Sequence, residues 1–318
     1  MIFWRISGRP ATPPGLTKTM RVLIAGGTGF LGANLCAAVL RRTDEIACIS
    51  KSLPDLSLRI PGVHYIEEDL TVRVPAVPFS PDLVLNAAGY VAHPEGEADS
   101  NRLLVDHVSV ARNLMSVPGS THARFLQIGS GDEYSVQKRC LDENTEARGW
   151  GSYGRAKAAA SDFVMSSADE HGYRPTLLRA FLVYGRGQAP NRFLPQLIGG
   201  LAEGRRVPMS SGLQIRDFLH VDDFVEAVLL CSQTSATEGR TLNICSGSGV
   251  QIAEVARKVH RLIGIGELGF GEIVRRSDQA HQLVGDNQLI RRLTGWQPRI
   301  SLESGLLRMI KETASDSQ

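Results

Sequence analysis

A glycine-rich turn between an apolar segment and an amphipathic one constrains the fold of this chain more than any other feature. Residues 21–25 read RVLIA, residues 26–32 read GGTGFLG, and apolar side chains then recur up to residue 40 with the spacing of a helix buried on one side. Gly26 permits a tight turn, Gly29 the close approach of a pyrophosphate, and Gly32 the close packing of the helix on the strand. The N-terminus of that helix adds free N–H groups and a partial positive charge. Strand, glycine turn and helix in this order predict a dinucleotide site; without that context the same glycines would serve packing alone.

Further short segments rich in apolar residues alternate with helical patterns along most of the chain. They lie at 46–49, 63–66, 83–85, 125–128, 176–180 and 242–245. Such strands separated by helices are typical of a parallel sheet covered on both faces. We therefore predict an α/β fold built on a doubly wound parallel sheet of the Rossmann type.

The length of 318 residues leaves room for about two domains of ordinary size. Glycines and prolines at 185, 187, 190 and 195 break the regular pattern after residue 182. We predict a dinucleotide-binding domain over 20–181, to which a segment at about 218–248 returns, because 218–221 and 242–245 both have strand patterns. A smaller α/β substrate domain then comprises 182–217 and 249–318. Residues 1–19 are expected to form a disordered leader.

Composition excludes several classes of protein. The 42% of hydrophobic and 21% of charged residues are ordinary for a globular chain, and a net charge of +2 with scattered arginine pairs gives no reason to expect nucleic acid. Five cysteines without C-x-x-C spacing predict neither a disulfide framework nor a metal site. No apolar run is long enough for a signal peptide or a membrane-spanning helix. We expect a cytoplasmic protein without metal, membrane or nucleic acid as partner.

The residues that follow the later strands indicate which dinucleotide binds. An acidic residue for the ribose hydroxyls of NAD is expected about 20 residues after the glycine turn, but residues 50–52 read SKS. Ser50 and Lys51 can donate hydrogen bonds to a 2′-phosphate, which favours NADP while NAD stays possible; a solvated loop lysine is the alternative for Lys51. The predicted cofactor site comprises Gly26, Thr28, Gly29, Phe30, Leu31, Gly32, Ser50, Lys51, Asp69, Leu70, Ala87, Ala88 and Gly89.

Tyr153 and Lys157 stand four residues apart at the start of an alanine-rich stretch, so both side chains share one face of the predicted helix. A free phenol has a pKa of about 10, and a nearby ammonium together with a nicotinamide cation could lower it to about 7. Tyr153 would then act as an acid or base. Ser130 follows the strand at 125–128, at the sheet edge where such folds bind ligands. A tyrosine beside a lysine, and a serine in a glycine turn, are the structural alternatives.

Taken together, these positions resemble the extended short-chain dehydrogenase/reductases that act on nucleotide sugars, the NAD-dependent epimerase/dehydratase family. The matching motifs, spread from about residue 20 to about 311, are GGTGFLG at 26–32, NAAG at 86–89, YGRAK at 153–157, VYGRGQ at 183–188, RDFLHVDD at 216–223 and GWQP at 295–298. The resemblance implies a catalytic triad of Ser130, Tyr153 and Lys157, of which Tyr153 and Lys157 also contact the cofactor.

The same resemblance implies a nucleotide-diphosphate sugar as the substrate, held by the smaller domain. Arg216 and Arg275 are the expected diphosphate ligands, since a guanidinium matches that geometry, although each could be a surface arginine. Asn191 or Arg192 is expected to meet the nucleotide, and Asp132 the sugar. We also expect a homodimer. The chain departs from the family at 106–110, which read DHVSV where the family often has Asn and Gly-Thr.

Three reactions of that family compete. Its dehydratases carry an acidic pair directly after the catalytic hydroxyl residue, whereas Gly131 precedes Asp132 and Glu133 here. The GSGDEY segment is more similar to reductases. We predict an NAD(P)H-dependent oxidoreductase that reduces the 4-keto group of a nucleotide-linked 4-keto-6-deoxysugar. A 4-epimerase or 4,6-dehydratase with retained NAD stays open, because Asp132 stands where a dehydratase has its proton-abstracting glutamate. A silent NADP-sensing protein is the alternative of another class, and Tyr153 and Lys157 argue against it.

Overall fold

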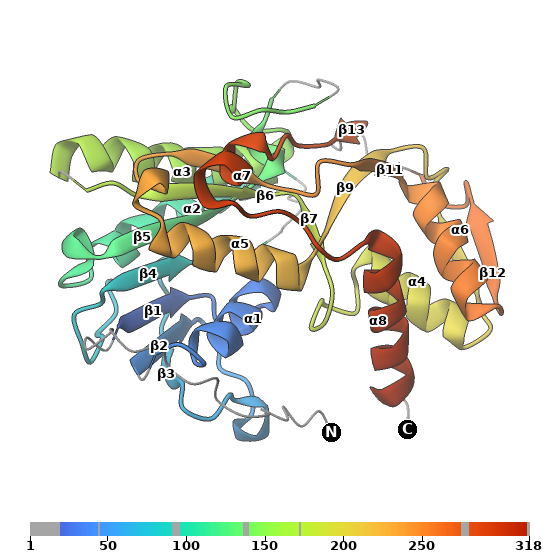
Figure 1. The fold of residues 1–318 in the computed structure, drawn as a ribbon, viewed down its shortest axis with the longest axis horizontal. Helices are drawn as coiled ribbons and strands as arrows, with labels where there is room; N and C mark the ends of the chain where they lie inside the picture. The colour runs from blue at the N-terminus through green and yellow to red at the C-terminus, as the bar shows by residue number, and fades with distance from the viewer. Residues whose placement is uncertain are drawn as a thin grey trace.

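The computed structural model describes residues 20–43, 45–90, 96–135, 140–171, 173–274 and 280–316. The leader predicted for residues 1–19 and the predicted phosphate ligand Arg275 lie outside these residues. The largest element is a seven-stranded parallel sheet in the order β10-β6-β5-β4-β1-β2-β3 (Figure 1). Its strands are β1 (Arg21–Ala25), β2 (Glu45–Ser50), β3 (His64–Glu67), β4 (Leu83–Asn86), β5 (Arg124–Ser130), β6 (Thr176–Ala180) and β10 (Thr241–Ile244).

Helices cover both faces of this sheet. Alternate side chains of β1 point to opposite sides: Val22 and Ile24 pack in one core, Leu23 and Ala25 in the other. The first core includes α1 (Phe30–Val39), α5 (Val221–Gln233) and α7 (Gln288–Thr294), and the second includes α2 (Glu97–Met115) and α3 (Gly151–His171). The predicted doubly wound fold is therefore confirmed.

A smaller part of the chain lies beside the sheet, on the right of Figure 1. Strands β7 (Leu182–Tyr184), β9 (Ile215–His220), β11 (Gly249–Gln251) and β13 (Gln282–Leu283) form one small sheet, and β8 (Arg206–Met209) pairs with β12 (Glu267–Phe270). Helices α4 (Phe193–Ala202), α6 (Ile252–Ile263) and α8 (Leu302–Asp316) share a third core that includes Leu197, Val255 and Leu306. None of the helices in the described residues is long and apolar enough to cross a membrane.

The two segments predicted to return to the dinucleotide-binding domain form strands in different sheets. The strand at 241–244 does return, as β10, and pairs with β6. Residues 218–220 instead belong to β9, which lies between β7, β11 and β13 and has no partner in the large sheet. An apolar run predicts a strand but not its neighbour, because β9 finds all its partners in segments distant in sequence. The domain boundaries themselves stay a prediction.

Two buried carboxylates bind the smaller part to the segments around it. Asp217 on β9 is fully buried and accepts hydrogen bonds from the backbone N–H groups of Ser246 (2.7 Å) and Gly247 (2.9 Å), just beyond β10. Asp223 on α5 accepts them from the backbone of residues 299 and 300, ahead of α8. These bonds supply the donors that the two buried carboxylates require.

Candidate active site

The glycine turn lies at the carboxyl end of β1 with its backbone exposed to an incoming ligand. Gly26 has a φ of +75°, and a Cβ there would lie 2.7 Å from Cα of Ala88. A Cβ at Gly32 would collide with the carbonyl oxygen of Gly26. Helix α1 starts after Gly29 with no side-chain cap and no acidic residue in its first turn. Its free N–H groups thus suit a pyrophosphate, so these residues fit the predicted dinucleotide.

The turn after β2 holds the two residues predicted to select NADP. Ser50 is buried at the end of the strand, where its Oγ accepts a hydrogen bond from the N–H of Thr28 (3.3 Å). The side chain of Lys51 is 75% exposed and forms an ion pair with Asp69 (2.7 Å). Asp69 also accepts hydrogen bonds from Thr71, and these contacts, that of Lys51 first, lower the pKa of Asp69 to about 2. Two residues predicted as separate cofactor contacts are therefore paired with each other.

The segments after β3 and β4 contribute differently. The side chain of Leu70 packs in the core and its carbonyl accepts a hydrogen bond from Asn113 (2.9 Å), and its contact with a cofactor stays a prediction. Ala87 and Ala88 lie directly against Gly26. A Cβ at Gly89 would be 3.1 Å from Nε2 of His107 and 3.2 Å from Nζ of Lys157. The β1 and β4 turns thus meet at one edge of the sheet, next to the predicted catalytic lysine.

The structure brings the predicted triad together at this edge. Ser130 ends β5, and Tyr153 and Lys157 lie on consecutive turns at the start of α3. The buried Lys157 ammonium donates a hydrogen bond to the carbonyl oxygen of Ile128 on β5 (3.1 Å). Burial lowers the pKa of Lys157, and the nearby Glu133 carboxylate opposes that shift. The helix and the strand are therefore joined through the lysine itself.

The phenol of Tyr153 keeps its proton at neutral pH. Burial, followed by the charges of Asp132 and Glu133, raises its pKa well above the ordinary value of a tyrosine, while Arg192 and a hydrogen bond with Ser130 oppose this shift more weakly. The protein groups alone thus act against the lowering expected from Lys157, because burial and two carboxylates outweigh the cations. Tyr153 is poised as a proton donor.

The two acidic residues after Ser130 differ in their surroundings. They form a 3-10 turn, η3 (Gly131–Glu133), in which Ser130 Oγ accepts a hydrogen bond from the N–H of Asp132 (3.1 Å). Glu133 is fully buried; it accepts hydrogen bonds from the N–H of Ser130 (2.8 Å), Ser161 Oγ (3.0 Å) and Arg179 Nε (2.9 Å). Asp132 is half-buried, with Oδ2 3.3 Å from Ser130 Oγ. Glu133 therefore fixes the turn that carries Ser130, which its sequence position did not indicate.

His107 on α2 is a second residue whose place the sequence did not predict, although it lies in the segment that departs from the family. Its ring is 95% buried and stands edge-on to the ring of Tyr153, 6.1 Å between centroids. Burial, followed by the charge of Lys157, lowers the pKa of His107 to about 4. The imidazole is therefore neutral at physiological pH.

The predicted substrate residues lie on the smaller part of the chain. Asn191 and Arg192 are exposed in the turn before α4, and Arg192 is near enough to influence Tyr153. Arg216 on β9 donates hydrogen bonds to the carbonyl oxygens of Ile215 (2.9 Å) and Ala280 (2.9 Å). The role of Arg216 in holding a diphosphate, and that of Asn191 or Arg192 in meeting the nucleotide, stay predictions.

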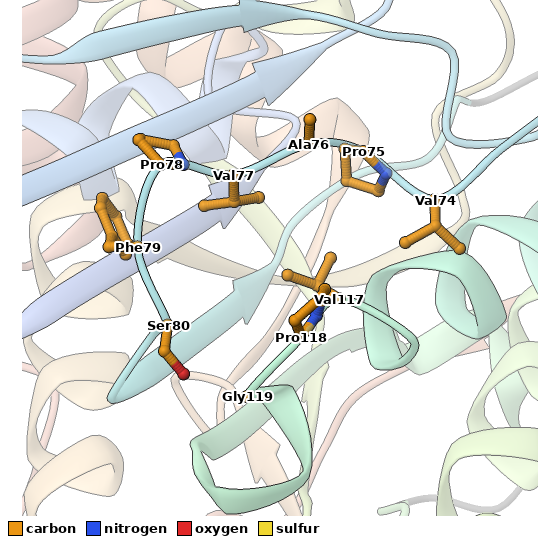
Figure 2. Close-up of a pocket in the computed structure, with 10 residues that line it drawn as sticks. All are labelled: Val74, Pro75, Ala76, Val77, Pro78, Phe79, Ser80, Val117, Pro118 and Gly119. Carbon is orange, nitrogen blue, oxygen red and sulfur yellow. The ribbon is translucent and has the colours of Figure 1, made fainter.

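An open apolar hollow of about 590 Å³ lies elsewhere on the molecule. It is lined by residues 74–80 and 117–119, which precede β4 and β5 and so lie at the opposite edge of the sheet from the triad. Figure 2 shows proline and valine side chains around it, and no charged residue lines it. This hollow offers no group for acid–base chemistry.

Comparison with known proteins places these features in a family context. The model of the NAD dependent epimerase/dehydratase family matches residues 22–245. The chain is 26% identical over 302 residues to dTDP-glucose 4,6-dehydratase of Mycolicibacterium smegmatis, covering 90% of this chain and 91% of that protein. It is 23% identical over 297 residues to CDP-abequose synthase of Salmonella typhimurium, covering 91% and 97%. The solved structure of MoeE5 with UDP-glucuronic acid and NAD superposes with a TM-score of 0.81 at 25% identity, covering 94% of this chain and all of that one.

Proposed function

Because this chain belongs to the NAD-dependent epimerase/dehydratase family, we propose that it reduces the 4-keto group of a nucleotide-linked 4-keto-6-deoxysugar with NADPH or NADH. The burial of Glu133 carries the choice of reaction. A 4,6-elimination needs a base to remove the proton at C5 and an acid to protonate the departing hydroxyl at C6. Glu133 is held by Arg179, Ser161 and the backbone of Ser130, so of the acidic pair we assign only Asp132 a place at the substrate. Reduction of a ketone needs one proton donor, which Tyr153 supplies.

The relatives support the substrate and cofactor classes of this proposal. Their names include a dTDP-sugar and a CDP-sugar enzyme, and MoeE5 was solved with a UDP-sugar and NAD. A nucleotide-diphosphate sugar is the substrate class common to the three. The nucleotide base differs among them, so we leave the base of the substrate open.

The chemistry of this chain's residues follows from their protonation states. A bound nicotinamide dinucleotide, cradled by the turns at 26–32 and 87–89, would supply the hydride for the ketone carbon. Tyr153, which keeps its proton at neutral pH, donates that proton to the carbonyl oxygen as the oxygen gains charge. Ser130 Oγ holds the same oxygen in place, and the ammonium of Lys157 stabilises the phenolate left behind.

We propose a preference for NADP over NAD. The end of β2 carries Ser50 and Lys51 and no carboxylate, so a 2′-phosphate meets hydrogen-bond donors there. The ion pair with Asp69 uses one of the three hydrogens of the Lys51 ammonium and leaves two to donate. The pair also ties the exposed lysine to Asp69, beyond the end of β3.

A 4,6-dehydratase is the second candidate, favoured by the similarity to dTDP-glucose 4,6-dehydratase and by the position of Asp132. The two reactions treat the cofactor differently. A reductase releases oxidised cofactor in every cycle, whereas a dehydratase or epimerase returns the hydride and keeps its cofactor.

The deciding experiment incubates the protein with NADPH and a panel of nucleotide 4-keto-6-deoxysugars, with mass spectrometry of the products and the absorbance of reduced nicotinamide recorded in parallel. We expect one NADPH consumed per sugar reduced, and little cofactor bound to the purified protein. Conversion of an unoxidised nucleotide sugar without loss of that absorbance, by protein isolated with bound NAD, would establish the dehydratase or epimerase instead. No turnover with any sugar would favour the silent sensor.

A further inference from the structure

The imidazole of His107 carries a buried ring nitrogen with no partner among the described residues. Its Nδ1 lies 2.8 Å from the carbonyl oxygen of Leu103 and therefore carries the proton, since a carbonyl can only accept. Nε2 is then an acceptor, and it is buried without a hydrogen bond. An unsatisfied buried group costs about 1–3 kcal/mol, so an acceptor left open here points to a donor that the described residues do not provide.

The ammonium of Lys157, which can only donate hydrogen bonds, also lies near Gly89. Nε2 of His107 and Nζ of Lys157 face the same side of Gly89, at 3.1 and 3.2 Å from the place a Cβ would take. Gly89 has no side chain to stand between them, and its φ of +137° disfavours any other residue. The ammonium gives one hydrogen to Ile128 and has two more to donate.

These two nitrogens together select one kind of chemical group. The neutral imidazole nitrogen can only accept a hydrogen bond, and the ammonium can only donate. A single atom that meets both nitrogens must donate a hydrogen to one and accept a hydrogen from the other. A carboxylate or carbonyl cannot donate and an ammonium cannot accept, whereas a hydroxyl does both.

We propose that His107 is a positioning residue whose Nε2 accepts a hydrogen bond from a hydroxyl, while the oxygen of that hydroxyl accepts one from Lys157. The hydroxyl belongs either to the ribose beside the nicotinamide of a bound cofactor or to one buried water. In both cases His107 fixes the lysine that serves Tyr153. The inference rests on the proposed function only in taking a nicotinamide dinucleotide as the ligand.

The test uses two variants of the full chain that differ in the acceptor alone. His107→Gln puts an amide oxygen where Nε2 was, and His107→Leu removes the acceptor; His107→Met replaces the leucine variant should that one fail to fold. NADPH and NADH are titrated by fluorescence without any sugar, alongside an analogue that lacks the hydroxyls of the nicotinamide ribose. Thermal unfolding of the ligand-free variants is measured in parallel.

If the hydroxyl is the ribose's, His107→Leu weakens cofactor binding about tenfold, the equivalent of ~1.4 kcal/mol, and His107→Gln restores most of it. The analogue then binds wild type and the leucine variant equally weakly. If the hydroxyl is a water, affinity stays constant and the leucine variant unfolds at a lower temperature than the glutamine variant. Leucine and glutamine variants that behave alike in both measurements overturn the proposal. Cofactor binding is measured without turnover, so this outcome is independent of whether a 4-keto sugar is reduced.

Discussion

Replacing Glu133 by glutamine is expected to destabilise the fold more than it impairs the chemistry. Arg179 and Glu133 form an ion pair at 2.9 Å with side chains that are 7% and 0% exposed, so the variant leaves a buried guanidinium without its anion. Glutamine still offers one oxygen to the N–H of Ser130 and to Ser161, but its amide nitrogen faces Arg179 donor to donor. If Glu133 were instead a catalytic acid, the variant would fold normally and lose turnover.

The size of this effect follows from the burial of both partners. Removing one partner of a buried ion pair costs about 3–5 kcal/mol, and the hydrogen bonds that glutamine keeps favour the lower end, ~3 kcal/mol. At about 2.1 cal/mol/K per residue, 318 residues have an unfolding entropy of about 0.7 kcal/mol/K, so ~3 kcal/mol lowers Tm by about 4–5 °C.

Urea unfolding followed by circular dichroism measures this loss, with turnover assayed at a temperature where both proteins are folded. The matched control is Glu303→Gln, which breaks an exposed ion pair with Lys258 (2.8 Å) and is expected to cost less than ~1 kcal/mol. The reasoning is refuted if Glu133→Gln unfolds within ~0.5 kcal/mol of wild type, the more so if turnover falls about 100-fold at unchanged stability.

Three further outcomes are expected. Tyr153→Phe should bind cofactor nearly as wild type and lose turnover about 100-fold or more, because its hydroxyl serves the transition state; a residual rate above about a tenth would contradict the triad. Wild type should show a higher kcat/KM with NADPH than with NADH, and Lys51→Glu should reverse that order; a wild-type preference for NADH would contradict the role of the lysine. Since Lys51 and Thr71 hold the pKa of Asp69 at about 2, below the ordinary 3.8, Asp69 contributes stability that is present above about pH 4 and lost as pH falls toward 2. Asp69→Asn should therefore be less stable at neutral pH and lose less between pH 4 and 2 in acid titrations of unfolding; an unchanged acid profile would contradict the ion pair.

The sequence predicted the large sheet because each of its parts is encoded locally. Glycines at 26 and 32 lie within one strand, turn and helix, and the spacing of Tyr153 and Lys157 places both on one helix face before any tertiary contact forms. The strand pattern at 218–221 did not indicate which sheet it joins, since the partners of β9 lie far away in sequence.

The environments of single side chains were harder to foresee. The buried Glu133 forms an ion pair with Arg179, which lies on the neighbouring strand β6. The spacing of these two residues in the sequence does not predict that pair. The surroundings of the His107 ring nitrogen include Gly89, in the loop after β4, and Lys157 on α3, both distant from it in sequence. The sequence motifs indicate the candidate reacting groups, whereas the protonation states of these groups depend on the side chains packed around them.

Strand β10 is synthesised long after its neighbour β6, which affects the folding of the nascent chain. Residues 181–240 intervene between β6 and the strand that covers its free edge, so a nascent chain carries that edge open until Thr241 has been synthesised. An uncovered strand edge presents unpaired N–H and C=O groups to any neighbouring chain and favours aggregation. A fragment cut at the apparent end of the glycine-turn region, near residue 181, should therefore aggregate on expression even though it contains the triad.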